Sequence, residues 1–402
     1  MIEASRVVTS VPEEILKNPF VGPIGPEETR SDPLEFHRRL PGYVPTRLVD
    51  APVMADRLGV GRLLVKDEGR RLGLPAFKML GASWATYRAL SVRLGGEIGR
   101  WNTIDELAEW VAPLRPLALA TATDGNHGRA VARMAALLGF EARILVPSGT
   151  PPAFVGALGG EGAAVTIVDG DYDDAVRRAA LEAGPRCLVI SDTSWPGYEE
   201  IPLWVIEGYS TIFTEVDEVL AVGGVEPDVV VVPVGVGALG AAAVHWACRP
   251  GRGRQAQLWA VEPVTAACVM ESIRRGERTS IDHTHDSIMN GLNAGTPSLV
   301  AWPLLQRGFD WLVTIEDEWA RRAMRDLAET GVVAGATGAA GLGALFAIRE
   351  LLGSDWTRAM GLGARSTVLV LCTEGATDPT LYQQVVGVPA EQVDTSRAQV
   401  VG

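Results

Sequence analysis

Short runs of apolar residues recur along the chain from about residue 60, and stretches with helical spacing of apolar positions lie between them. The runs are rich in Val, Ile and Leu and do not alternate with polar residues, which is typical of parallel strands covered by helices on both faces. The expected strands are 63–68, 117–121, 142–146, 163–168, 188–190, 229–234, 258–261 and 367–371. The expected helices include one that begins near Gly81 and the segments 128–138, 173–183, 204–219, 241–248 and 319–330. The pattern therefore predicts an α/β protein.

Composition narrows the class of protein without marking a domain boundary. The 402 residues are enough for two domains or one large one, and 47% hydrophobic with 21% charged residues is ordinary for a globular enzyme. A formal net charge of −13 argues against nucleic acid or an anionic membrane surface as a partner. No apolar run reaches membrane length and no signal core follows Met1, so a cytoplasmic location is expected. The Pro-rich segment before residue 60 is expected to wrap over the surface.

The four cysteines are scattered along the chain. Their spacing fits neither a disulfide framework nor a zinc site. His283, His285 and Asp286 could suggest a metal ion, but a solvated loop explains them better, so no metal is predicted. The cysteines are Cys187, Cys248, Cys268 and Cys372.

Lys78 is the first candidate for chemistry. It lies between the strand 63–68 and the helix expected near Gly81, with Phe77 and Met79 on either side. Burial beside a helix N-terminus would favour the neutral amine, which attacks carbonyl carbons, and such lysines form Schiff bases with pyridoxal phosphate. The alternative is a surface lysine whose stem crosses apolar neighbours to reach water.

A glycine-rich loop follows the strand 229–234. It reads Gly235-Val236-Gly237-Ala238-Leu239-Gly240 and leads into an apolar helix, so its backbone N–H groups can hold a phosphate. The same letters form a G-x-G-x-x-G pattern, with Glu262 where a ribose-binding acid could lie. A dinucleotide site, and with it an NAD-dependent dehydrogenase, therefore stays open here beside a purely structural turn.

Two further polar segments follow expected strands. The segment 121–128 contains Asp124, Asn126 and His127, and lies where α/β sheets bind ligands, although an ordinary capped turn would also explain it. Cys372 ends the last strand and is followed by Thr-Glu-Gly-Ala-Thr-Asp; a cysteine in this place is often only core packing.

Taken in this order, these pieces resemble the fold-type II pyridoxal-phosphate enzymes, the group of tryptophan-synthase β-chain and threonine dehydratase. The resemblance covers most of the chain from about residue 40. It implies two open, mostly parallel sheets flanked by helices, with the cofactor in a cleft between a large domain (1–85 and 200–402) and a smaller inserted one (86–199). It also implies a homodimer, by analogy alone.

The same resemblance assigns roles to the candidate residues. Lys78 of the Phe77-Lys78 turn would bond to the cofactor aldehyde, and Asn126 would hydrogen-bond its 3-hydroxyl oxygen. The loop from Gly235 to Gly240 would hold its phosphate. Cys372 would face the pyridine nitrogen, and a neutral partner there limits the ring as an electron sink and favours rapid β-elimination.

Within that group the chain is most similar to diaminopropionate ammonia-lyase. The similarity rests on the segments 122–129, 192–202, 261–263, 291–298 and 373–379. It implies a small amino-acid substrate, 2,3-diaminopropionate, converted to pyruvate and two ammonia. Lys78 would take the Cα proton of the L isomer and Asp124 that of the D isomer. Asp192 would anchor an amino group, because a buried carboxylate needs a cationic partner; a turn residue is the alternative.

Three departures from the family pattern bear on the reaction. Ala336 stands where the family has a glutamate, and Asn290 where an alanine is expected. Ala294 stands where some members have a cysteine able to pair with the one at Cys268, so that disulfide is not expected. A β-replacement synthase, in which a nucleophile captures the unsaturated product, therefore stays open beside the lyase, as does a protein with the fold but little turnover.

Overall fold

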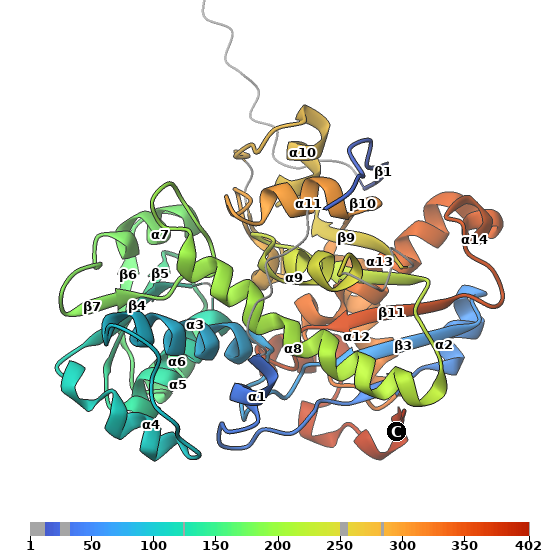
Figure 1. Ribbon diagram of the computed structural model, residues 1–402. Helices are drawn as coiled ribbons and strands as arrows, with labels where there is room; N and C mark the ends of the chain where they lie inside the picture. The colour runs from blue at the N-terminus through green and yellow to red at the C-terminus, as the bar shows by residue number, and fades with distance from the viewer. Residues whose placement is uncertain (1–12, 25–32, 124, 250–255, 283–284, 402) are drawn as a thin grey trace, which may run out of the picture.

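The computed structural model describes residues 13–24, 33–123, 125–249, 256–282 and 285–401. The strands form two sheets, and helices cover the faces of both (Figure 1). The strands are β1 (Glu14–Lys17), β2 (Leu48–Asp50), β3 (Arg62–Asp67), β4 (Ala118–Ala122), β5 (Glu141–Pro147), β6 (Ala164–Val168), β7 (Cys187–Val189), β8 (Val229–Pro233), β9 (Gln257–Pro263), β10 (Trp311–Ile315), β11 (Thr367–Cys372) and β12 (Gln399–Val400).

The helices alternate with these strands along the chain. They are α1 (Pro33–His37), α2 (Pro52–Leu58), α3 (Lys78–Arg93), α4 (Ile104–Trp110), α5 (Asn126–Leu138), α6 (Pro152–Gly160), α7 (Tyr172–Ala180), α8 (Glu200–Gly223), α9 (Ala238–Ala247), α10 (Cys268–Arg275), α11 (Trp302–Gly308), α12 (Asp317–Glu329), α13 (Ala336–Leu352), α14 (Trp356–Ala359) and α15 (Pro379–Val386).

The larger sheet has eight strands in the order β1-β10-β9-β8-β11-β3-β2-β12. Its five central strands, from β10 to β3, are parallel, whereas β1, β2 and β12 pair antiparallel at the two edges. Two of these edge strands come from the N-terminal segment that was expected only to wrap over the surface. That expectation is wrong for β2, because Leu48 and Val49 are buried in the core.

The smaller sheet has four parallel strands in the order β6-β5-β4-β7. The eight strands expected from apolar runs are all present, and α5, α7, α8, α9 and α12 occupy the expected helical segments. The strands β1, β2, β10 and β12 and the helix α13 were not predicted. The predicted mostly parallel α/β architecture is confirmed.

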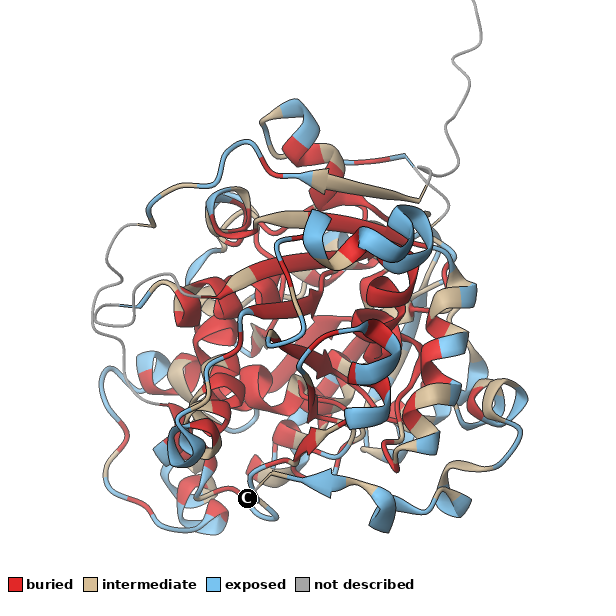
Figure 2. Ribbon diagram, turned by 90° about the vertical axis from the view of Figure 1, so that its right-hand side faces the viewer, coloured by how far each residue is buried: buried red, intermediate tan, exposed pale blue. Residues whose placement is uncertain are grey.

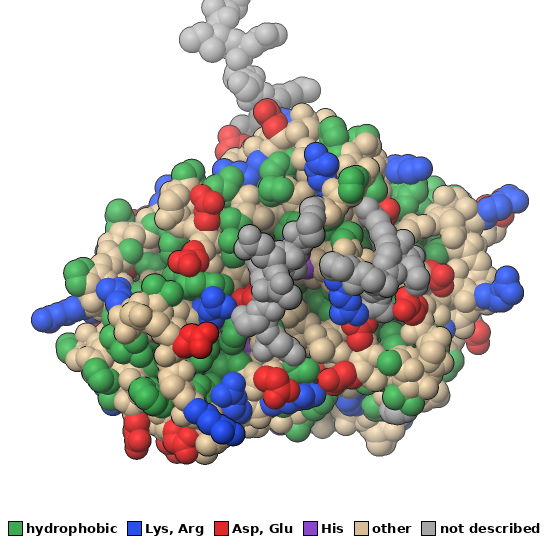
Figure 3. All heavy atoms as spheres, in the orientation of Figure 1, with side chains coloured by type: hydrophobic (Ala, Val, Ile, Leu, Met, Phe, Trp, Pro, Cys, Tyr) green, Lys and Arg blue, Asp and Glu red, His purple; other side chains and the backbone are tan. Residues whose placement is uncertain are grey.

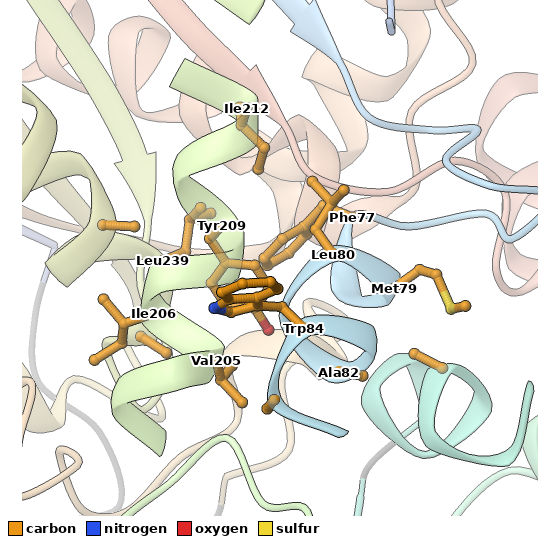
Figure 4. Close-up of a cluster of buried hydrophobic side chains, with 14 of the residues drawn as sticks. Phe77, Met79, Leu80, Ala82, Trp84, Val205, Ile206, Tyr209, Ile212 and Leu239 are labelled. Carbon is orange, nitrogen blue, oxygen red and sulfur yellow. The ribbon is translucent and has the colours of Figure 1, made fainter. Parts of the chain in front are cut away.

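Helices α3 and α8 pack closely against each other between the two sheets (Figure 4). Gly81 and Gly208 lie at the crossing: a Cβ atom on Gly208 would lie 2.6 Å from the carbonyl oxygen of Leu80. One on Gly81 would lie 2.5 Å from the Tyr209 ring. The predicted domain boundary at 85/86 falls inside α3, so the limits of the two domains stay a prediction.

One large hydrophobic cluster joins the two halves of the molecule. It contains Leu119 and Val131 beside the smaller sheet and Val230 and Leu369 in the larger one. Buried residues fill the strands and the inner faces of the helices, while exposed residues lie on the outer faces (Figure 2). On the face seen in Figure 3, acidic and basic side chains are interspersed rather than gathered by sign. Within the part of the chain that the structure describes, no helix is long and apolar enough to cross a membrane.

Candidate active site

Lys78 is the first residue of α3, three residues earlier than the start predicted near Gly81. The turn before it is fixed by the backbone: Ala76 pairs with Glu374, and the N–H of Phe77 donates to the carbonyl oxygen of Thr373 at 3.3 Å. The lysine is therefore held against the end of β11 by main-chain contacts, and its side chain is only 18% exposed.

Lys78 forms an ion pair with Asp192, which follows β7. Nζ of Lys78 donates to Oδ2 of Asp192 at 2.6 Å, and the Tyr172 hydroxyl donates to Oδ1 at 3.3 Å. Burial would raise the pKa of Asp192, but the Lys78 ammonium outweighs that effect and holds the pKa below its ordinary value. Lys78 therefore lies against a buried carboxylate and not among apolar groups alone.

His127 lies beside this pair. Its Nδ1 is 3.8 Å from Oδ2 of Asp192, and its Nε2 is 2.8 Å from the carbonyl oxygen of Ile190. Burial lowers the pKa of His127. A neutral ring that donates from Nε2 to Ile190 leaves Nδ1 as an acceptor, and that atom is buried without a hydrogen-bond partner.

The glycine-rich loop joins β8 to α9, as predicted. Gly237 has φ +99°, a left-handed conformation that favours glycine, and a Cβ atom on it would lie 2.4 Å from the Leu305 side chain. A Cβ atom on Gly235 would lie 2.9 Å from the carbonyl oxygen of Gly291. No side chain caps the N-terminus of α9, so its first N–H groups are available to an anion.

Asn126 is the first residue of α5 and follows Gly125, whose φ is +156°. Its Nδ2 donates to Oε2 of Glu374 at 2.6 Å, while its Oδ1 is buried without a partner. Glu374 is itself buried, which raises its pKa, although several donors to the carboxylate oppose that effect. Asp124, the predicted second base, lies outside the described residues.

These groups line one cavity between the two sheets. It lies beyond the carboxyl ends of β4, β7, β8 and β11, the edge of parallel sheets where ligands bind. The lining residues are Phe77, Lys78, Asn126, Tyr172, Asp192, Thr337, Thr373 and Glu374 together with the segments 233–240 and 291–294. All of the predicted loop from Gly235 to Gly240 is among them.

The lining fits a phosphorylated aromatic aldehyde. An amine lies at one part of the cavity and an uncapped helix N-terminus at another, and two buried polar atoms, Asn126 Oδ1 and Thr373 Oγ1, lack partners. Buried polar atoms without partners are costly, so such atoms in a cavity indicate the place of a ligand.

A family model described as pyridoxal-phosphate dependent enzyme matches residues 39–373. The chain belongs to this family. Its cofactor is therefore pyridoxal phosphate, and the fold-type II class predicted from sequence is confirmed. The alternative of a dinucleotide bound at the loop 235–240, and with it a dehydrogenase, is excluded by the same match.

Within the family, the predicted similarity to diaminopropionate ammonia-lyase is confirmed. The Salmonella typhimurium diaminopropionate ammonia-lyase is 33% identical over 88% of this chain and 90% of its own length. The Escherichia coli enzyme, solved in complex with D-serine, has a TM-score of 0.85 and 32% identity, covering 94% of this chain and 97% of that one. The same enzyme in complex with an aminoacrylate-PLP azomethine reaction intermediate has a TM-score of 0.82 with the same identity and coverage.

Several lining residues were missed or placed differently by sequence reasoning. Neither Tyr172 nor Thr337 was among the predicted site residues. Cys372 is buried and its thiol donates to the carbonyl oxygen of Glu374 at 3.5 Å, but among the described residues that line the cavity it is Thr373 that follows β11. The role of Cys372 at the pyridine nitrogen stays a prediction.

Cys268, for which no disulfide was expected, is a free cysteine in the structure.

Metal ligation has no support among the described residues, where no group of three or more His, Cys, Asp and Glu side chains could hold an ion. His283 lies outside those residues. His285 is described, and its ring lies against Gly295 and Asp173.

Proposed function

We propose that this protein is an ammonia-lyase that converts 2,3-diaminopropionate and water into pyruvate and two molecules of ammonia. The observation that carries the proposal is the Lys78–Asp192 pair, 2.6 Å apart in the family's cofactor cavity, in a chain similar to diaminopropionate ammonia-lyases over 88% of its length.

The cofactor supplies an electron-withdrawing ring that makes the Cα–H bond of a bound amino acid breakable. Lys78 lies at the base of the cavity, where its amine can take that proton once it is free of the cofactor. While Lys78 is engaged by the cofactor, Asp192 lacks its lysine partner, and its buried carboxylate needs another cation. An ammonium group of the substrate meets that need and is thereby oriented at the reacting carbon.

The charge of the cavity supports a diamine as substrate. Among the described lining residues the charged side chains are Lys78, Asp192 and Glu374, so the lining carries more acidic than basic groups. A second ammonium group on the substrate is favoured by such surroundings, whereas a second carboxylate is not. The role of Asp124 as the base for the D isomer belongs to this proposal.

The direct test is to purify the protein with pyridoxal phosphate, record its visible spectrum and add D- and L-2,3-diaminopropionate separately. We expect pyruvate and ammonia in a ratio of one to two. The isomer that reacts faster would distinguish Lys78 from Asp124 as the base. In Lys78→Ala both the visible band of the bound cofactor and the turnover should be lost.

Three outcomes would contradict the proposal or part of it. A visible band with no pyruvate from either isomer would mean a different substrate. A new β-substituted amino acid formed in the presence of an added nucleophile, with little pyruvate, would instead establish the replacement synthase. A band that survives unchanged in Lys78→Ala would remove the role assigned to that lysine.

The proposal includes a homodimer in the cytoplasm. The four free cysteines support a reducing compartment, since disulfides form mainly in oxidising ones. The assembly state is checked by light scattering coupled to gel filtration, where a mass close to 42.7 kDa would contradict the dimer.

A further inference from the structure

A chain of hydrogen bonds runs along the cavity lining and ends on the carboxylate of Glu374. The N–H of Gly291 donates to the Thr337 hydroxyl at 3.2 Å, and the Thr337 side chain helps to lower the pKa of the Glu374 carboxyl. The Thr337 N–H donates to Oε1 of Glu374 at 3.2 Å, and Asn126 Nδ2 donates to Oε2 at 2.6 Å. The hydrogen bonds from the Thr337 N–H and from Asn126 both use the Glu374 carboxylate as the acceptor.

Close backbone contacts hold Glu374 in place. Its main chain pairs with Ala76 in the lysine turn, and its carbonyl oxygen accepts the N–H of Gly335 at 3.0 Å. A Cβ atom on Gly338 would lie 2.3 Å from that carbonyl oxygen, and one on Gly335 would lie 2.9 Å from Oε1. The residue is 6% exposed, so its carboxylate has little freedom to turn away from Asn126.

We propose that Glu374 is a positioning residue that sets which atoms of the Asn126 amide meet the ring hydroxyl of pyridoxal phosphate. A carboxylate accepts hydrogen bonds only, so it fixes the nitrogen end of the amide toward itself. The unpartnered Oδ1 and the second hydrogen of Nδ2 are then left for the ligand. This inference rests on the proposed place of the cofactor ring beside Asn126.

Glu374→Gln separates this role from simple packing, because the two side chains have nearly the same shape. The Thr337 N–H requires an acceptor at the Oε1 position, so the glutamine oxygen must take that place. The glutamine NH₂ would then face Asn126 Nδ2, donor against donor. Asn126 must turn its amide over to present Oδ1, and the ring hydroxyl meets a reversed pair of atoms.

The experiment titrates cofactor-free protein with pyridoxal phosphate and with its 3-deoxy analogue, which lacks the ring hydroxyl. In Glu374→Gln we expect affinity for pyridoxal phosphate to fall about tenfold to a hundredfold, the effect of losing a charge-assisted contact, and affinity for the analogue to change much less. In an Asn126→Ala background the same substitution should cause no further loss, because the residue through which it acts is gone.

Glu207→Gln is the matched control. Glu207 is also buried, accepts from Trp84 Nε1 at 2.6 Å and lies 3.6 Å from the Arg88 guanidinium, but it is on α8 and does not line the cavity. It should leave both affinities unchanged. If Glu374→Gln does not fold, Glu374→Asp serves instead: it keeps an acceptor for Thr337 but withdraws the oxygen from Asn126, with the same ligand-selective loss expected.

Equal losses for the two ligands, or losses that add in the double variant, would overturn the inference and leave Glu374 a packing residue. Failure of the wild-type protein to bind pyridoxal phosphate would overturn the proposed place of the cofactor itself, and with it this inference. If the wild type binds pyridoxal phosphate and turns over normally, but Glu374→Gln weakens both ligands equally, the inference about Glu374 is overturned and the proposed function stands.

Discussion

Asp192 carries its charge in a buried place only because Lys78 lies 2.6 Å away. A carboxylate without that partner would be protonated or would draw another cation to itself. In the cofactor-free protein the two groups therefore depend on each other. In the proposed function, the same carboxylate would bind a substrate ammonium while the lysine is engaged by the cofactor.

This dependence gives a stability that changes with pH. Because the pKa of Asp192 is lowered on folding, the native state holds its proton less tightly than the unfolded chain does. The contribution is thus present above the ordinary aspartate pKa of about 3.9 and is lost as the pH falls below it. We expect cofactor-free Asp192→Asn to be about 1–3 kcal/mol less stable than wild type at pH 7, with a difference that shrinks below pH 4. Urea denaturation at several pH values measures it.

Asp326→Asn is the control for this series, because Asp326 pairs with the half-exposed Arg57 on the surface. Its effect should stay below about 1 kcal/mol. A difference between Asp192→Asn and wild type that does not shrink in acid would contradict the ion pair.

Among single residues, the sequence predicted those whose role is indicated by their immediate neighbours in the chain. Lys78 stands beside a helix start, Asn126 in a strand-to-helix turn, and the glycines between a strand and a helix. Glu374 is different: its partner Asn126 is 248 positions away, and nothing in either segment alone indicates the contact. Tyr172 was missed for the same reason, since its hydroxyl meets Asp192 only after β4 and β7 have paired.

Among the elements, α3 and α8 carry a strict steric requirement. Gly208→Ala should destabilise the protein by about 1–3 kcal/mol, since the new methyl group would lie 2.6 Å from a backbone oxygen of α3. Gly156→Ala, in the exposed helix α6, meets nothing within 4 Å and should instead stabilise by about 0.5–1 kcal/mol. Denaturant midpoints of the two variants should move in opposite directions; a shift in the same direction would contradict the close crossing.

A buried group of ion pairs joins α8 to β3 and to the segment between β3 and Lys78. Glu215 accepts from Lys66 and from Arg71, each at 2.6 Å, and all three side chains are no more than 1% exposed. Glu215→Gln removes the charge that both cations share, and we expect a loss of about 3–5 kcal/mol of unfolding free energy. Glu218→Gln, one turn along the same helix in an exposed pair with Arg38, should cost less than about 1 kcal/mol. Comparable losses in the two variants would contradict a buried network.

The elements that the sequence predicted are those with a clear apolar period or run. The helix α13 was missed because almost all of its residues from Ala336 to Ile348 are buried, so it has no polar face to give a helical period. The edge strands β1, β2 and β12 have two to four residues and pair antiparallel with other segments of the chain. Strands this short give no hydrophobic pattern long enough to predict them.

In the whole molecule, the cofactor cavity lies between two sheets that share one hydrophobic core. The cluster that contains Leu119 of the smaller sheet also contains Val230 of the larger one, and the helices α3 and α8 belong to it. Two parts that share a core lose stabilising contacts together, so neither is expected to unfold while the other stays intact. The two sheets are thus separate in topology but are expected to unfold together.

Calorimetry can test this reading. We expect a single heat-absorption peak for the cofactor-free protein and again a single peak, at higher temperature, with pyridoxal phosphate. The ligand adds about 2.7 kcal/mol when its free concentration is a hundred times its dissociation constant. Asn126 comes from the smaller sheet's side and the loop 235–240 from the larger one's, so a cofactor bound by both, as proposed, would not stabilise one alone. Two peaks in the cofactor-free protein that merge on adding pyridoxal phosphate would mean that the shared core is weaker than its burial implies, and that the cofactor itself joins the two halves.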